Sequence, residues 1–120
     1  MRGEGYLTKT GQYALVYSKG KSRTSDLFVM KTLPNGLNLP RYGLSVSKRV
    51  GNAVIRNRVK RMLREILRTK PLESGWDIML IVRSLAANAN YTEMDKSIDD
   101  LLSQAQLLRS PEETVRLGIS

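Results

Sequence analysis

Apolar side chains recur along residues 53–70 with the spacing of an α-helix that buries one face. At about 100° per residue, Ile55, Val59, Met62, Leu63, Ile66 and Leu67 fall on one arc. Asn52 stands where an N-cap is preferred, and Pro71 ends the pattern because the residue before a proline is pushed out of the α region. The pattern predicts a helix that packs with its apolar arc and exposes the opposite one.

Three shorter segments have the patterns of β-strands. Residues 27–33 begin with a compact apolar run, and Pro34, Asn35 and Gly36 then form a strong turn signal. Residues 42–48 alternate between large apolar and small or polar side chains, which is typical of a strand with one buried face. Residues 76–82 are nearly all apolar after Asp77, which predicts an interior strand covered on both faces.

Two further segments have helical spacing. Residues 8–19 place Tyr13, Val16 and Tyr17 on one face, and Gly20 follows where a left-handed C-terminal residue is favoured. A last helix is expected to begin near Asn90, with Glu93 as its capping-box partner, and to stop at Ser110 and Pro111. Its expected core stripe is Tyr91, Met94, Ile98, Leu101, Leu102, Ala105 and Leu108.

This order predicts an α+β or α/β sandwich in which helices pack on a sheet of three or four strands. The strand–helix–strand unit of residues 42–82 is expected to be parallel, and the general rule makes such a crossover right-handed. A chain of 120 residues is expected to form one domain, with an ordered core at about 7–109 and tails at 1–6 and 110–120.

Composition narrows the classes of function. The chain has no Cys and no His, which removes disulfides, the commonest metal ligand and the commonest general base. It shows no apolar run long enough to span a membrane and no signal-peptide pattern, so we expect a cytoplasmic protein. The acids Glu93, Asp95, Asp99 and Asp100 suit a solvated helix face rather than a metal site.

The net charge of +9 is concentrated in one block. Residues 41–70 contain ten lysines and arginines and a single acid, Glu65. Because like charges one turn apart repel, such a face is favoured when a polyanion meets it, and RNA, DNA and an anionic membrane all qualify. A membrane is disfavoured because the apolar arc of the helix is needed for the core. Asn52 and Gly51 are equally consistent with simple capping and with a backbone phosphate site.

Tyr13, Tyr17 and Phe28 have two open interpretations. Their spacing suits core packing, yet aromatic side chains flanked by cations also stack on the bases of single strands. The flanking cations are Lys9, Lys19, Lys21, Arg23 and Lys31.

Residues 43–65 read GLSVSKRVGNAVIRNRVKRMLRE, which closely resembles the signature of the bacterial ribonuclease P protein subunit. The likeness extends to the first helix with its paired aromatics, to residues 76–83 and to residues 91–108. It implies the order α-β-β-β-α-β-α on a small mixed sheet, with an atypical left-handed crossover in place of the right-handed default.

The resemblance also implies a function. Members bind a catalytic RNA that removes the 5′ leader of precursor tRNA with Mg²⁺, which the RNA mainly holds, and the protein alone is not catalytic. A 1:1 protein–RNA complex is expected, with no tightly bound metal on the protein. The residues that would face the catalytic RNA are Lys48, Arg49, Asn52, Arg56, Asn57, Arg58, Lys60, Arg61 and Arg64. Those that would meet the leader are Tyr13, Tyr17, Phe28 and Lys31, the last standing where some relatives have an aromatic residue.

Two other classes remain to be weighed. A non-enzymatic ribosomal or RNA-chaperone protein would have the same composition. A protein-only nuclease is disfavoured because the sequence has no evident catalytic constellation.

Overall fold

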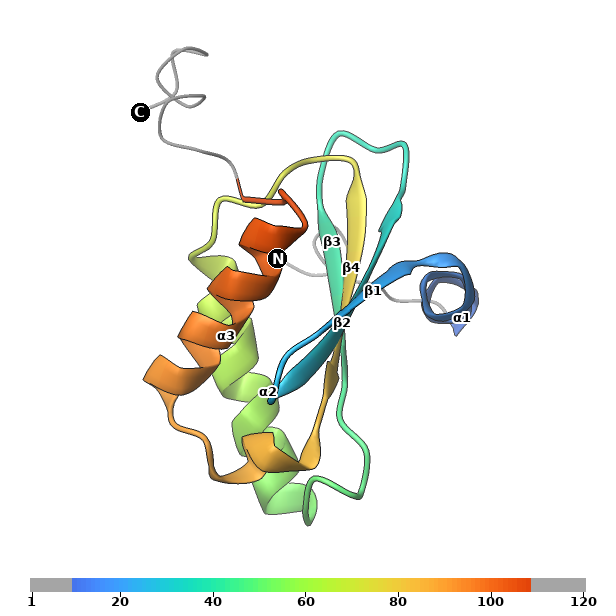
Figure 1. The fold of residues 1–120 in the computed structure, drawn as a ribbon. Helices are drawn as coiled ribbons and strands as arrows, with labels where there is room; N and C mark the ends of the chain where they lie inside the picture. The colour runs from blue at the N-terminus through green and yellow to red at the C-terminus, as the bar shows by residue number, and fades with distance from the viewer. Residues whose placement is uncertain (1–9, 109–120) are drawn as a thin grey trace.

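In the computed structural model, which describes residues 10–108, the apolar run at 76–82 forms an interior strand of a four-stranded sheet (Figure 1). The strands are β1 (Lys21–Thr24), β2 (Phe28–Pro34), β3 (Arg41–Ser45) and β4 (Trp76–Val82), in the order β1-β2-β4-β3. β4 pairs antiparallel with β2 and parallel with β3, and five of its seven residues are buried. The prediction of a strand covered on both faces is therefore confirmed.

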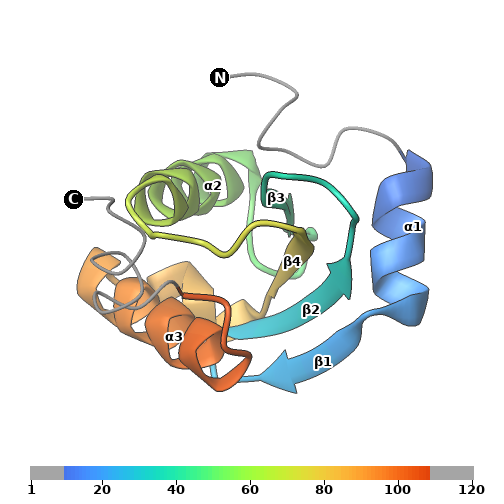
Figure 2. The same ribbon diagram turned by 90° about the horizontal axis from the view of Figure 1, so that it is seen from above.

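Helices cover both faces of the sheet (Figure 2). They are α1 (Thr10–Lys19), α2 (Ala53–Arg68), a short 3-10 helix η1 (Ser84–Asn88) and α3 (Tyr91–Gln104). α2 and α3 lie on one face and α1 lies alone on the other. Apart from η1, the order is the α-β-β-β-α-β-α that the resemblance implied.

The crossover from β3 through α2 to β4 is left-handed. β3 and β4 both run downward in Figure 1, and hence away from the viewer in Figure 2. In Figure 2 the step from β3 to β4 goes down the page while α2 lies to the left of the sheet. The right-handed expectation from the general rule is wrong here, and the expectation from the family is confirmed.

α2 has the predicted amphipathic design. Val59, Leu63, Ile66 and Leu67 are buried against the sheet and α3. The Asn52 side chain accepts a hydrogen bond from the Ile55 amide (3.0 Å), so capping at this residue is confirmed. The apolar arc of α2 packs in the core, so the cationic arc faces outward.

α3 begins as predicted, with a capping box between Asn90 and Glu93, but it ends earlier. Gln106 adopts a positive φ of 58°, and the Leu107 amide donates to the Leu102 carbonyl (2.9 Å). This left-handed turn reverses the chain and buries Leu107. The predicted end at Ser110 is therefore wrong, and so is the core role of Tyr91, which is 42% exposed.

Two other differences have simple causes. The all-polar strand β1 is exposed along its whole length, so no hydrophobic pattern marks it. β3 stops at Ser45 rather than at residue 48, because its ladder with β4 ends at Ile81 and the chain must turn to enter α2. In that turn the Val50 amide donates a hydrogen bond to the Ser47 carbonyl (3.1 Å).

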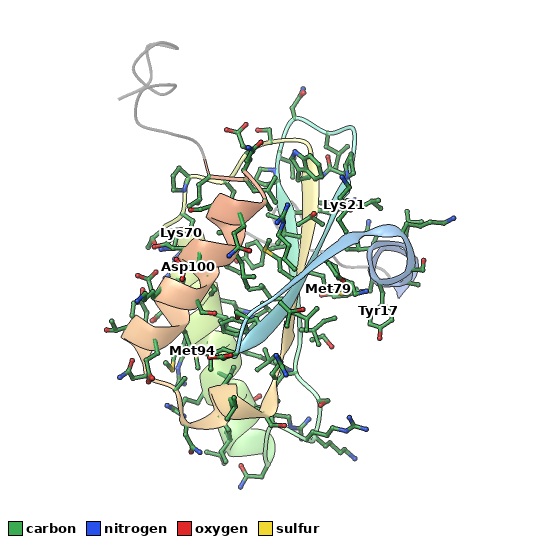
Figure 3. The ribbon with its side chains drawn as sticks, viewed as in Figure 1. Tyr17, Lys21, Lys70, Met79, Met94 and Asp100 are labelled. Atoms are coloured by element: carbon green, nitrogen blue, oxygen red, sulfur yellow. The ribbon has the colours of Figure 1, made fainter. Side chains whose placement is uncertain are left out.

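Two groups of ion pairs connect helices and strands of the fold. Arg41 binds both carboxylate oxygens of buried Asp77 (2.8 Å each), and this hydrogen bonding raises the pKa of Arg41 above its ordinary value. Lys70, labelled in Figure 3, follows α2 and pairs with Asp95 and Asp99 of α3. Burial lowers the pKa of Lys70, but the hydrogen bonds to the two carboxylates outweigh it and leave that pKa raised.

Candidate nucleic-acid interface

The outer face of α2 is a mainly cationic surface with one acid, Glu65. Arg61, Arg64 and Arg68 are exposed, and Lys60 is half-buried. A hollow of about 430 Å³ runs along the face and is lined by Asn57, Lys60, Arg61, Arg64, Glu65 and Arg68. Within residues 10–108, none of these cations forms an ion pair with a carboxylate, since the pairs found there belong to Arg41 and Lys70. The face therefore presents uncompensated charge, of the kind that phosphates neutralise.

The segment at residues 56–58 is less accessible than its sequence suggested. Arg58 donates from Nη1 to the Ala87 carbonyl and from Nη2 to the Ala89 carbonyl (3.2 Å each), which ties α2 to η1 and the start of α3. Arg56 is half-buried, and its Nε is a buried donor with no acceptor among the described residues. Asn57 alone of the three is exposed. Arg58 thus has a structural role that sequence reasoning missed.

The turn before α2 adds two more cations. Lys48 and Arg49 are exposed between the end of β3 and the Asn52 cap. Asn52 itself is exposed, although its side-chain oxygen is engaged with the Ile55 amide. The predicted set for the catalytic RNA therefore lies along one face of α2 and the turn that leads into it, with Arg58 turned partly inward.

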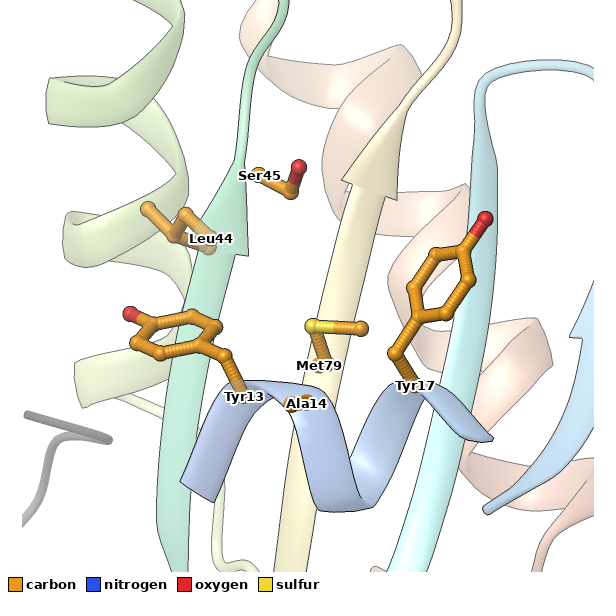
Figure 4. Close-up of a pocket in the computed structure, with 6 residues that line it drawn as sticks. All are labelled: Tyr13, Ala14, Tyr17, Leu44, Ser45 and Met79. Atoms are coloured by element: carbon orange, nitrogen blue, oxygen red, sulfur yellow. The ribbon is translucent and has the colours of Figure 1, made fainter. Parts of the chain in front are cut away.

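A second surface lies on the opposite face of the sheet, where α1 crosses it. A groove of about 610 Å³ lies there, and Figure 4 shows the residues that line it: Tyr13, Ala14 and Tyr17 of α1, Leu44 and Ser45 of β3, and Met79 of β4. Val16 is fully buried and holds α1 against Met79. Figure 3 places Tyr17 and Met79 on this side, away from Met94 of α3.

Tyr17 and Lys31 meet at one end of this groove. Tyr17 is 60% exposed, so its ring is available to a ligand. The Lys31 ammonium lies 4.6 Å from the centroid of that ring and donates to the Tyr17 carbonyl (3.1 Å). An exposed aromatic ring beside a cation is a combination that single-strand-binding proteins use.

Phe28 does not belong to this surface. It is fully buried in the core between the sheet and α2 and α3, together with Met30 and Ile66. Strand residues alternate between faces, so Lys31 points toward α1 while Phe28 points away from it. The prediction that Phe28 meets the leader is corrected: no nucleotide can reach its ring.

Sequence reasoning missed Ala14, Ser45 and Met79 as groove residues. The alternation of residues 42–48 contained part of the signal, because Gly43 and Ser45 lie on the face opposite buried Tyr42. The two surfaces are joined by β3, since its last residue, Ser45, lines the groove and the chain then passes Lys48 and Arg49 into α2.

No helix within residues 10–108 is long and apolar enough to cross a membrane. In the same part of the chain, no group of three acidic side chains converges in the way that a metal ion needs.

Comparison with known proteins agrees with this chemistry. The family model "Ribonuclease P" matches residues 1–106. The ribonuclease P protein component of Dehalococcoides mccartyi strain CBDB1 is 47% identical over 113 residues, covering 94% of each chain. That of Caldanaerobacter subterraneus is 40% identical over 108 residues, covering 88% of this chain and 93% of the relative.

Solved structures show the same fold. The RNase P protein of Staphylococcus aureus superposes with a TM-score of 0.78 at 31% identity, covering 87% of this chain and 97% of that one. The RNase P protein of Thermotoga maritima gives a TM-score of 0.77 at 27% identity, covering 84% and 97%. The residues matched by the family model, 1–106, include both the α2 face and the α1 groove.

Proposed function

Because the chain belongs to the ribonuclease P protein family, we propose that it binds the catalytic RNA of ribonuclease P through α2 and the 5′ leader of precursor tRNA through the α1 groove. The observation that carries this proposal is the presence of two chemically different surfaces on opposite faces of one sheet. One is a row of uncompensated cations and the other is an aromatic groove with one cation.

The cationic face of α2 suits the folded catalytic RNA. Guanidinium groups pair with two phosphate oxygens at once, and Arg61 and Arg64 stand one turn apart on the exposed side. Lys48 and Arg49 extend the same charge beyond the N-terminus of the helix. Binding here releases counterions, so the affinity for the RNA falls steeply as salt concentration rises.

The α1 groove suits a single strand. A leader base stacks on the exposed ring of Tyr17, and Lys31 pairs with a neighbouring phosphate. Tyr13 and Met79 supply an apolar floor on which a second base can lie. Stacking accepts every base, because each has a π-face, so one groove can serve precursor tRNAs with different leaders.

We assign the cleavage of the 5′ leader to the catalytic RNA. The described carboxylates do not fit a Mg²⁺ site, so no step is assigned to a metal ion held by the protein. The protein acts by position and charge: it holds the leader near the RNA and lowers the repulsion between two polyanions. We expect a 1:1 complex with the catalytic RNA in the cytoplasm.

Cleavage of precursor tRNA at low Mg²⁺ tests the proposal. Three reactions are compared, with the protein alone, the catalytic RNA alone, and both together. Stimulation of the RNA by the protein is expected, without cleavage by the protein alone. Cleavage by the protein alone would identify a nuclease, and an RNA reaction unaffected by the protein would favour an RNA chaperone.

A further inference from the structure

The two most exposed large aliphatic side chains within residues 10–108 are Val54, at 77%, and Leu85, at 65%. Single exposed apolar residues are ordinary on a protein surface. These two, however, come from different elements, α2 and η1, and both lie outside the α1 groove and outside the hollow along α2. They are not used by the function proposed above.

Hydrogen bonds bring the two elements together at one end of the molecule. Arg58 of α2 donates to the carbonyls of Ala87 and Ala89, at the end of η1 and just after it. Val54 precedes Arg58 by four residues, so it lies one turn earlier on the same side of α2. The Ser84 hydroxyl, next to Leu85, lies 3.5 Å from the Arg49 carbonyl in the turn before α2. Figure 1 shows η1 beside the first turn of α2.

Exposed cations adjoin both elements that carry these aliphatic residues. Lys48 and Arg49 are exposed in the turn that precedes α2, and Arg83 is exposed directly before η1. Residues 45–64 and 78–92, which build this end, contain no Asp or Glu. The β1–β2 turn brings Asp26 near, because its neighbour Ser25 accepts from Arg83 at 2.8 Å. The charge around Val54 and Leu85 is therefore clearly positive.

We propose that Val54 and Leu85 form a contact for one unpaired nucleotide of the catalytic RNA, whose flanking phosphates pair with Lys48 and Arg49. The aliphatic side chains cover one face of the base or ribose, which water would otherwise contact. This inference rests on the proposed function and adds a non-electrostatic contact to the α2 face. Salt dependence distinguishes Val54 and Leu85 from the arginines of α2, because an apolar contact releases no counterion.

A second copy of this chain is the rival occupant. A two-fold contact through the same patch would set Lys48 and Arg49 of one copy against those of the other, and the whole chain carries +9. Such a contact is repulsive unless an anion neutralises it. Charge complementarity therefore favours RNA.

The test is the equilibrium affinity of the protein for ribonuclease P RNA over a series of salt concentrations. The double variant Val54→Gln/Leu85→Gln keeps both side chains long and removes their apolar surface. It should bind the RNA about tenfold more weakly at every salt concentration, with the log–log slope unchanged. Leu37→Gln is the matched control, since Leu37 is 41% exposed in the β2–β3 loop and should leave the affinity unchanged.

Different results would show whether the proposed function fails or this inference alone fails. If the wild-type protein does not bind the RNA, the proposed function fails. If the wild type binds and the double variant binds equally well, this inference alone is overturned. A wild-type dimer in sedimentation that the double variant loses, with RNA affinity unchanged, would assign the patch to a second copy.

A photoreactive benzoylphenylalanine at position 85 should crosslink to the RNA and one at position 37 should not; absence of the first crosslink would also overturn the inference.

Discussion

The ring of Tyr13 lies against the backbone of Gly43, so closely that a Cβ at residue 43 would stand 2.6 Å from Tyr13 Cε1. Tyr13 belongs to α1 and Gly43 to the edge strand β3, so this contact sets how near the helix approaches the sheet. The α1 groove has Tyr13 on its wall because residue 43 has no side chain.

Gly43→Ala should therefore displace Tyr13 and α1. We expect the free energy of unfolding to fall by about 1–3 kcal/mol, the usual cost of overpacking, and leader binding to weaken. Gly11→Ala is the control in the same helix, because a Cβ at Gly11 meets nothing within 4 Å. That change should stabilise the protein by roughly 0.5–1 kcal/mol through helix propensity. Urea unfolding measures both, and equal stability of Gly43→Ala and wild type would show that the ring moves aside freely.

Arg61→Ala and Arg64→Ala should weaken binding of the catalytic RNA and flatten its salt dependence. Each lost phosphate contact lowers the magnitude of the log–log slope by roughly one. Both side chains are exposed, so folding should be unaffected. An unchanged slope would mean that these arginines do not touch phosphate.

Arg58→Met should act on stability instead. Removing the guanidinium leaves the Ala87 and Ala89 carbonyls without their donor, while the methionine keeps much of the packing volume. We expect a loss of about 1–3 kcal/mol in the free energy of unfolding. A variant as stable as wild type, but weaker in binding RNA, would show that Arg58 serves the RNA and not the fold.

Gln106→Gly should stabilise the protein. Gln106 is the single non-glycine residue with positive φ within residues 10–108, and it occupies the left-handed position that ends α3. Glycine accepts this conformation without the Cβ penalty, so a gain of about 1 kcal/mol is expected. Thermal unfolding measures it, with Lys96→Gly at an exposed position in the middle of α3 as a control that should destabilise.

The sequence predicted best where the hydrophobic period is unambiguous. Val59 and Leu63 follow helical spacing under strong capping and stop signals, and α2 formed with the expected faces. β4 was also predicted correctly, because a continuous apolar run of this short length is typical of a strand buried on both faces. In these segments, local propensity and tertiary burial agree.

Phe28 marks the limit of that reasoning. β2 is covered on both faces, so Phe28 and Met30 on one side and Val29 and Leu33 on the other are all apolar. No alternation reveals which side α1 will cover, and that choice decides which residues face the groove. The partners of Arg58 were hidden for a similar reason: Ala87 in η1 and Ala89 just after it lie 29 and 31 residues away along the chain.

We expect the substrate leader and the catalytic RNA to use different faces of the sheet. The direct measurement is the affinity of the reconstituted holoenzyme for precursor tRNA with and without its leader, for wild type and Tyr17→Ala. Tyr17→Ala should weaken leader-bearing substrate by about 1–3 kcal/mol and leave mature tRNA unchanged, while the affinity between protein and catalytic RNA stays at the wild-type value. An equal loss of affinity for both substrates, or a loss of binding to the catalytic RNA, would show that Tyr17 does not belong to a separate leader site.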